Sequence, residues 1–213
     1  MSGPSGTVAA MEQHMNEHRD EHMDEQEYAR LDGLYRARVA EHDEQIPGHA
    51  QAWERFTALV VSHGGRLVVP PLSPEVHLAL LTDRLQAWPG PGAELRRGEP
   101  NRCHGNSSML WLAEEVAAIA TGYALSGDGL WRQHTWGLTE NGTVVETTEL
   151  RDAYVGFLLT DAEAIVFAAA NVDDTAFVDA LLADGRASGT ARLMLADHAA
   201  GDPSDLGSDG ATP

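Results

Sequence analysis

Two short loops that contain glycine, at residues 126–129 and 140–142, constrain the fold of this chain more than any other feature of its sequence. Glycine readily adopts the positive φ angles of tight turns, and each loop lies between two stretches of strand-forming residues, an arrangement typical of β-hairpins. We therefore expect a small antiparallel sheet with strands at 122–125, 130–138, 143–150 and 154–159.

Helices are expected before and after this sheet, where apolar residues recur every three or four positions. The segments concerned are 11–45, as one or two helices broken near Gly33, then 51–62, 73–88, 161–170 and 173–184. The chain is thus predicted to form one α+β domain at 11–199, with a helical part at 11–97, a core at 98–160 and closing helices at 161–199. Residues 1–10 and 200–213 lack this periodicity and are expected to be disordered.

The charge of the chain argues against several classes of partner. It has 33 acidic residues against 14 basic ones, a formal net charge of −19, which is the opposite of what binds a phosphate backbone, so no nucleic-acid partner is expected. No apolar run approaches the roughly 18 residues that a membrane span needs, and no secretory signal is evident. A single cysteine allows no internal disulfide and suits a reducing compartment, so we expect a cytoplasmic protein without a membrane partner.

Three histidines near the N-terminus, His14, His18 and His22, are four residues apart and therefore stack on one helix face. Such a face is able to hold a zinc or nickel ion, and a metal-binding protein is one alternative for this chain. The segment is otherwise uniformly polar, which favours a solvated helix. We therefore expect neither a metal nor a cofactor.

The only cysteine, Cys103, stands at the start of a predicted helix. This helix is expected to continue to about residue 120, since apolar residues from Met109 onward recur at helical spacing. If Asn101 caps the helix, Cys103 lies in its first turn, where free N–H groups and the helix dipole favour a thiolate. If Asn106 or Ser107 is the cap, that argument weakens.

His134 lies on the strand predicted at 130–138, and the loop that follows decides which acid it meets. With a two-residue turn, Glu146 falls opposite Gly137 and on the other face from His134, so Glu149 or no acid at all becomes the partner. With a three-residue loop, Glu146 falls opposite Trp136 and becomes the diagonal neighbour of His134. The sequence permits both registers.

A cysteine that opens a helix, a strand with His-x-Trp, and a strand that ends in an acid followed by threonine resemble the papain-like cysteine superfamily, and within it the transglutaminase-like core. The resemblance implies that Cys103 is the nucleophile, His134 the base and Glu146 the orienting acid, with Trp136 and Thr147 as the usual neighbours of the last two. It implies a nucleophile-bearing helix packed on the sheet.

The resemblance covers roughly residues 100–160 and departs from the family at the third position, where aspartate is usual and this chain has glutamate. It implies a thiol enzyme that acts on an amide or peptide bond, with hydrolysis favoured over transfer to an amine, and with a peptide, a protein or a small amide as substrate. The backbone N–H of Cys103 and the side chain of Asn101 are candidate oxyanion donors, and Trp136 is a candidate substrate-binding residue. His104 ranks second as the base, and a catalytically silent binding module is the main alternative.

Overall fold

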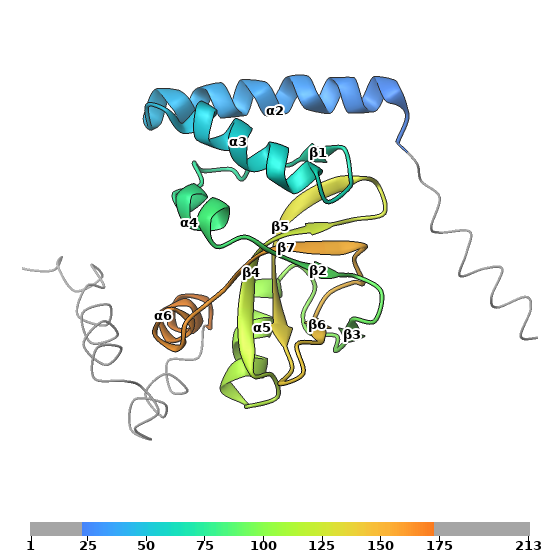
Figure 1. The fold of residues 1–213 in the computed structure, drawn as a ribbon, viewed down its shortest axis with the longest axis vertical. Coiled ribbons are helices and arrows are strands. Elements are labelled where there is room, and N and C mark those ends of the chain that lie inside the picture. Colours follow the sequence, from blue (N-terminus) through green and yellow to red (C-terminus); the bar gives the residue numbers. More distant parts are fainter. Residues whose placement is uncertain (1–22, 173–213) are drawn as a thin grey trace, which may run out of the picture.

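The computed structural model describes residues 23–172 as an α+β fold, which confirms the predicted class (Figure 1). The elements are α2 (Glu25–Gln45), α3 (His49–Val61), β1 (Leu67–Val68), α4 (Leu78–Asp83), β2 (Gln86–Pro89), β3 (Glu94–Leu95), α5 (Cys103–Leu112), β4 (Ala118–Leu125), β5 (Leu130–Leu138), β6 (Val144–Glu146), β7 (Ala153–Leu158) and α6 (Asp161–Asn171). In Figure 1, α2 and α3 lie together at one end of the molecule, and α5 and α6 lie toward the other.

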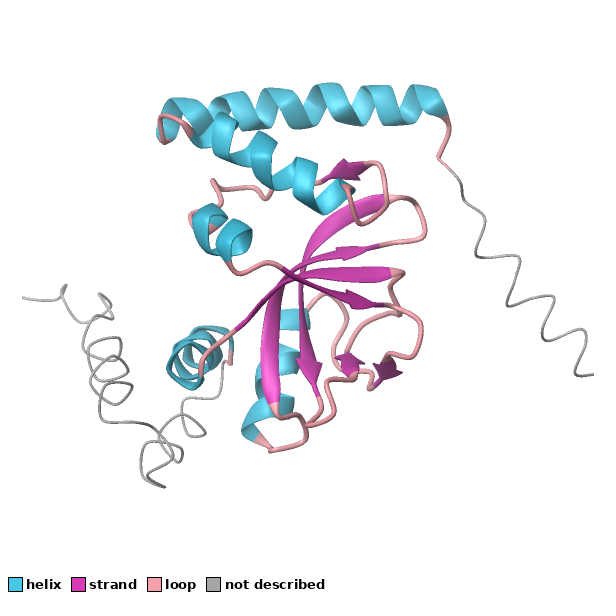
Figure 2. Ribbon diagram, in the orientation of Figure 1, coloured by secondary structure: helices cyan, strands magenta, loops and turns pink. Residues whose placement is uncertain are grey.

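The sheet is larger than predicted and is not wholly antiparallel. Its strand order is β2-β7-β4-β5-β6-β3, and β1 pairs with β5 off this path (Figure 2). The central strands are antiparallel, but the β1–β5 and β3–β6 pairs are parallel. The expectation of a small antiparallel sheet is therefore wrong at the edges, where short segments from the helical part of the chain join it.

Strand β5, which has the predicted bounds of 130–138, organises the centre of the molecule. On one edge it pairs with β4 over residues 131–138. On the other edge β1 pairs with residues 130–131 and β6 with residues 137–138. Residues 132–136 have no strand partner on that edge within the described part of the chain, and α5 packs against β5.

The two faces of the sheet are covered by separate hydrophobic clusters. The larger one joins the sheet to α3 and α4 and includes Trp53, Phe56, Val60, Leu78, Leu81, Tyr123, Trp131 and Val155. The smaller one includes Ala120, Ala124, Trp136, Leu138, Val144 and Tyr154. Because side chains alternate along a strand, β5 contributes Trp131 to the first cluster and Trp136 to the second.

Helix α2 is continuous, so the predicted break near Gly33 is wrong. One glycine costs a helix only about 1 kcal/mol relative to alanine. Asp24 caps the helix by accepting from the Glu27 N–H at 2.8 Å. The Tyr28 hydroxyl, on a buried ring, donates to the Asp128 carbonyl at 2.7 Å and ties the helix to the β4–β5 turn.

Two predicted helices are shorter than expected because strands replace their ends. The helix predicted over 73–88 is limited to α4, and Gln86–Pro89 forms β2 against the free edge of β7. The helix predicted from Cys103 to about 120 ends at Leu112, and 118–125 forms β4 between two partner strands. Met109, expected on a buried face, is 43% exposed. Apolar residues at these positions suit either a helix or a buried strand, and pairing decided between them.

Helix α6 confirms the predicted helix over 161–170 and begins with a capping box between Thr160 and Glu163. The histidine face, the tails predicted as disordered and the helix predicted over 173–184 lie outside the described residues. Among the described helices, none has the length and apolar character that crossing a bilayer requires.

Candidate active site

The start of α5 fills the gap on the free edge of β5. Backbone N–H and C=O groups alternate in direction along a strand. The bond from the Val69 N–H to the Trp131 carbonyl shows that the backbone groups of Trp131 point away from β4. Those of Thr135 therefore point the same way: its N–H interacts with the sulfur of Cys103, and its carbonyl accepts from the Ser107 hydroxyl at 3.2 Å. The first turn of α5 is thus bound directly to the backbone of β5.

The loop before α5 is fixed by a side chain of the helix itself. Asn106 accepts from the Glu99 N–H at 3.1 Å and donates to the Glu99 carbonyl at 2.8 Å. A Cβ on Gly98 would lie 2.4 Å from Cγ of Asn106, so this close approach requires glycine. These contacts place Cys103 as the first residue of α5, partly buried beside β5.

The loop between β5 and β6 has three residues, 140–142. The Thr139 N–H bonds the Thr143 carbonyl at 3.0 Å, and Gly142 has a φ of 78°. The pairing of Gly137 with Val145 places Trp136 opposite Glu146 and makes His134 its diagonal neighbour. Of the two registers that the sequence permits, the structure has the one that brings Glu146 to His134.

Glu146 holds His134 through a fully satisfied, buried carboxylate. Its Oε2 is 2.8 Å from His134 Nε2 and accepts from the Tyr154 hydroxyl at 3.0 Å. Its Oε1 accepts from the N–H groups of Thr147 and Thr148, both at 2.8 Å, and from the Thr148 hydroxyl at 2.9 Å. Burial raises the pKa of Glu146, but His134 and Thr148 outweigh it and lower this pKa to about 2. The carboxylate is therefore ionised.

The remaining ring nitrogen of His134, Nδ1, is left for Cys103, with which His134 shares a hydrogen bond. Burial alone would lower the pKa of His134, yet Cys103 and Glu146 raise it to about 9. Burial likewise opposes ionisation of Cys103, but the His134 ring and the Thr135 N–H lower the pKa of the thiol below its usual value. The two shifts together favour a thiolate–imidazolium pair.

Cys103 and His134 border a cleft of about 440 Å³. Its other lining residues come from the loop before α5, from β5 and from the segment after β6, and comprise Arg97, Gly98, Pro100, Asn101, Arg132, Gln133, Thr148, Glu149 and Arg151. Glu149, the alternative partner of His134, instead pairs with Arg151 at 2.8 Å.

Asn101 is not the cap of α5, which is Arg102. Asn101 has a φ of 59°, the left-handed conformation that asparagine tolerates better than most residues. It lines the cleft beside Cys103, so its amide stays a candidate donor. Cys103, as the first helical residue, also has a backbone N–H without an acceptor inside the helix.

Trp136 does not line the cleft, which corrects its assignment as a substrate-binding residue. Its side chain is fully buried, with its ring centroid 5.1 Å from that of Tyr154 and 5.4 Å from that of Trp88. It also stacks on His134 at 6.5 Å with an interplanar angle of 16°. Trp136 therefore packs behind the histidine rather than in front of it.

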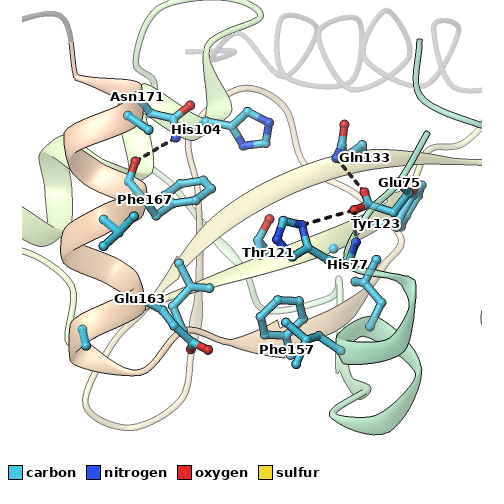
Figure 3. A pocket seen from close by; sticks show the side chains of 17 residues that line it. Glu75, His77, His104, Thr121, Tyr123, Gln133, Phe157, Glu163, Phe167 and Asn171 are labelled. Atoms are coloured by element: carbon cyan, nitrogen blue, oxygen red, sulfur yellow. Dashed lines mark hydrogen bonds and ion pairs between the residues drawn. The ribbon is translucent and has the colours of Figure 1, made fainter. Parts of the chain in front are cut away.

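His104 faces a different cavity, of about 610 Å³, between α4, α6 and the sheet (Figure 3). Its Nδ1 is 2.6 Å from the Thr135 hydroxyl, and its ring contacts Phe167 edge-on at 5.5 Å. Burial, with the nearby positive His134, lowers the pKa of His104. The polar end of this cavity is the Glu75 carboxylate, which bonds Gln133 at 3.2 Å.

Sequence reasoning missed three partners in the Cys103 site. Thr148 follows Glu146 by two residues. Hydrogen bonds between threonine and acidic residues this close in sequence are common, so the sequence could have indicated this partner. The roles of Thr135 and Tyr154 depend on the docking of α5 and on the β4–β7 pairing, and no local pattern indicates them.

Searches of protein-family models, curated proteins and solved structures found no match to this chain. Within residues 23–172, no group of three or more histidine, cysteine, aspartate or glutamate side chains is arranged to hold a metal ion. The geometry of the site is therefore the basis for its chemistry.

Proposed function

We propose that this protein is a thiol enzyme that breaks an amide or peptide bond through a papain-like triad of Cys103, His134 and Glu146. The observation that carries the proposal is the unbroken chain of interactions from the cysteine at a helix start, through the histidine, to a buried and fully hydrogen-bonded acid. A cysteine on a helix and a histidine and acid on adjacent strands resemble the transglutaminase-like core, with glutamate at the acid position.

In the acylation step, the Cys103 thiolate attacks the carbonyl carbon, and the C–O double bond opens to a tetrahedral oxyanion. The backbone N–H of Cys103 donates to this oxygen, with Asn101 as a second donor. The His134 imidazolium then gives its proton to the leaving nitrogen as the C–N bond breaks. The products of this step are a thioester on Cys103, a free amine and a neutral imidazole.

In the second step, neutral His134 takes a proton from water, and the hydroxide adds to the thioester carbon. Collapse of the intermediate releases a carboxylic acid and restores the thiolate–imidazolium pair. Hydrolysis is favoured over transfer to an amine because water is always present, whereas transfer to an amine requires a site that excludes water, and most of the residues that line this cleft are polar. Glu146 keeps its negative charge throughout and holds the imidazole with Nδ1 toward the sulfur.

Replacement of the nucleophile tests this function. Cys103→Ala should abolish the release of amine from amide substrates while leaving the melting temperature within a few degrees, since Cys103 is only partly buried and leaves no large cavity. Amine release from a mixed peptide pool, followed by mass spectrometry, measures activity, and calorimetry measures stability. Activity that survives in Cys103→Ala would rule the proposal out.

A further inference from the structure

The cleft beside Cys103 is basic in a chain that is strongly acidic. Three arginines, Arg97, Arg132 and Arg151, line it, and Glu149 is the one acid among its described lining residues. The whole chain has no lysine and only 14 arginines, and its formal net charge is −19. A concentration of positive charge at this place favours an anionic reactant there.

Two of the three arginines are already neutralised by acids of the protein. Arg132 donates twice to the Asp128 carboxylate, at 2.9 and 2.5 Å. Arg151 pairs with Glu149 at 2.8 Å and also bonds the Ser126 hydroxyl. Their charges therefore contribute less to the binding of a ligand than that of an unpaired arginine.

Arg97 differs from both. Its side chain is exposed, and within the described residues it has no ion-pair or hydrogen-bond partner. Its backbone is held firmly, because the adjacent Arg96 and Gly98 N–H groups bond the carbonyls of Glu146 and Thr147, both at 2.8 Å. The free guanidinium thus projects from a segment that is anchored to the strand of the triad acid.

We infer that the cleft selects reactants that carry a carboxylate close to the bond under attack, and that Arg97 binds this carboxylate. A guanidinium matches a carboxylate with two parallel hydrogen bonds, and one unpaired positive charge balances one carboxylate rather than a doubly charged phosphate. The inference builds on the proposed function by naming a substrate class. The carboxylate has two possible sources, an acidic side chain or a free C-terminus.

The first test uses the thiol itself and requires no enzyme activity. Because Cys103 is the only cysteine, alkylation reports on this site alone. The probes are iodoacetate and iodoacetamide, which differ in charge at nearly equal size. The rate with iodoacetate divided by the rate with iodoacetamide should fall about threefold to tenfold in Arg97→Gln, because one positive charge near the sulfur is lost. The same ratio should not change in the control Arg55→Gln, which alters an exposed position of α3.

Arg97→Lys separates charge from geometry in the same assay. It retains the positive charge but not the two-pronged donor, so its ratio should fall between those of the wild type and Arg97→Gln. An unchanged ratio in Arg97→Gln would overturn the inference, and thermal melting of each variant verifies that the fold is intact.

The second test identifies the source of the carboxylate. Acetyl-Glu and acetyl-Gln p-nitroanilides compare an acidic side chain with its neutral counterpart, and acetyl-Gln-Gly and its glycinamide compare a free C-terminus with a neutral one. A kcat/KM preference of about tenfold for the charged member of either pair, lost in Arg97→Gln, supports the inference and names the source. Equal rates within both pairs would overturn the substrate class while leaving hydrolysis intact. An Arg97-dependent alkylation ratio without any hydrolysis would instead overturn the proposed function alone.

Discussion

The two histidines His104 and His134 both lie near Cys103, the first partly buried and the second fully buried, yet their surroundings give them opposite properties. His134 lies between a thiol and a carboxylate, and its pKa rises to about 9. His104 has a threonine hydroxyl and a phenylalanine ring as neighbours, and burial lowers its pKa. Partners rather than burial therefore decide which histidine carries a proton.

The cavities that they face differ in the same way. The cavity at His104 is larger and mostly lined by apolar side chains, with a polar end at Glu75. The cleft at His134 is smaller, and three arginines are among the residues that line it. Cys103 and His104 are adjacent in sequence but line different cavities. The volume of a cavity is therefore a poorer guide to its chemistry here than the charges and hydrogen bonds of its lining residues.

The largest expected effect separates the two histidines. His134→Ala should lower amide hydrolysis by about 10³-fold or more, because it removes both the proton donor and the partner of the thiolate. His104→Ala should leave the turnover number within about twofold and lower stability only modestly, through the lost Thr135 bond. Turnover numbers and calorimetry are to be measured on both variants. An inactive His104→Ala beside an active His134→Ala would contradict the assignment of His134 as the histidine that serves Cys103.

A smaller effect is expected from the acid. Glu146→Gln should lower turnover by about 10²-fold, since a neutral amide does not stabilise the imidazolium. It should also lower stability by about 1–3 kcal/mol, because an amide satisfies fewer of the donors around it. Glu149→Gln, which alters an exposed partner of Arg151, is the matched control and should retain turnover. Loss of activity confined to Glu149→Gln would contradict the triad.

The smallest effect concerns the hydroxyl that supports the acid. Tyr154→Phe removes one of five hydrogen bonds to the Glu146 carboxylate and keeps the ring that packs on Trp136. Turnover should fall by about threefold, because the carboxylate is held less firmly in place. The alkaline limb of the pH profile should shift slightly to higher pH, because the carboxylate stays ionised and loses a donor that competes with the His134 imidazolium for the same oxygen. An unchanged limb together with unchanged turnover would show that the hydroxyl serves packing alone.

Much of the site was predictable because its signals are local. Strict alternation places His134 and Trp136 on one face of β5, and a glycine at 142 permits the three-residue loop that brings Glu146 near. The choice between the two registers was not predictable, because both loops suit the same residues. It became fixed only once Val144 and Val145 were paired and buried against β5.

The ends of the helices were not predictable for a related reason. Val116, Ile119 and Ala120 repeat at helical spacing, but Ile119 and Ala120 lie in β4 between β5 and β7 and are fully buried. An apolar run that is buried on both sides carries no periodicity that distinguishes strand from helix. The parallel edges formed by β1 and β3 likewise depend on partners far away in the sequence.

The pH dependence of Cys103 alkylation by iodoacetamide tests the central claim most directly. If Cys103 and His134 form a thiolate–imidazolium pair, the rate should rise at a pH below the usual thiol pKa of about 8.5 and reach a plateau, with a second change near pH 9 as His134 loses its proton. Glu146→Gln should move the second change to lower pH, because the Glu146 carboxylate helps to raise the pKa of His134. A single rise at or above about pH 8.5 in the wild type, unaffected by that substitution, would contradict the pair and the triad built on it.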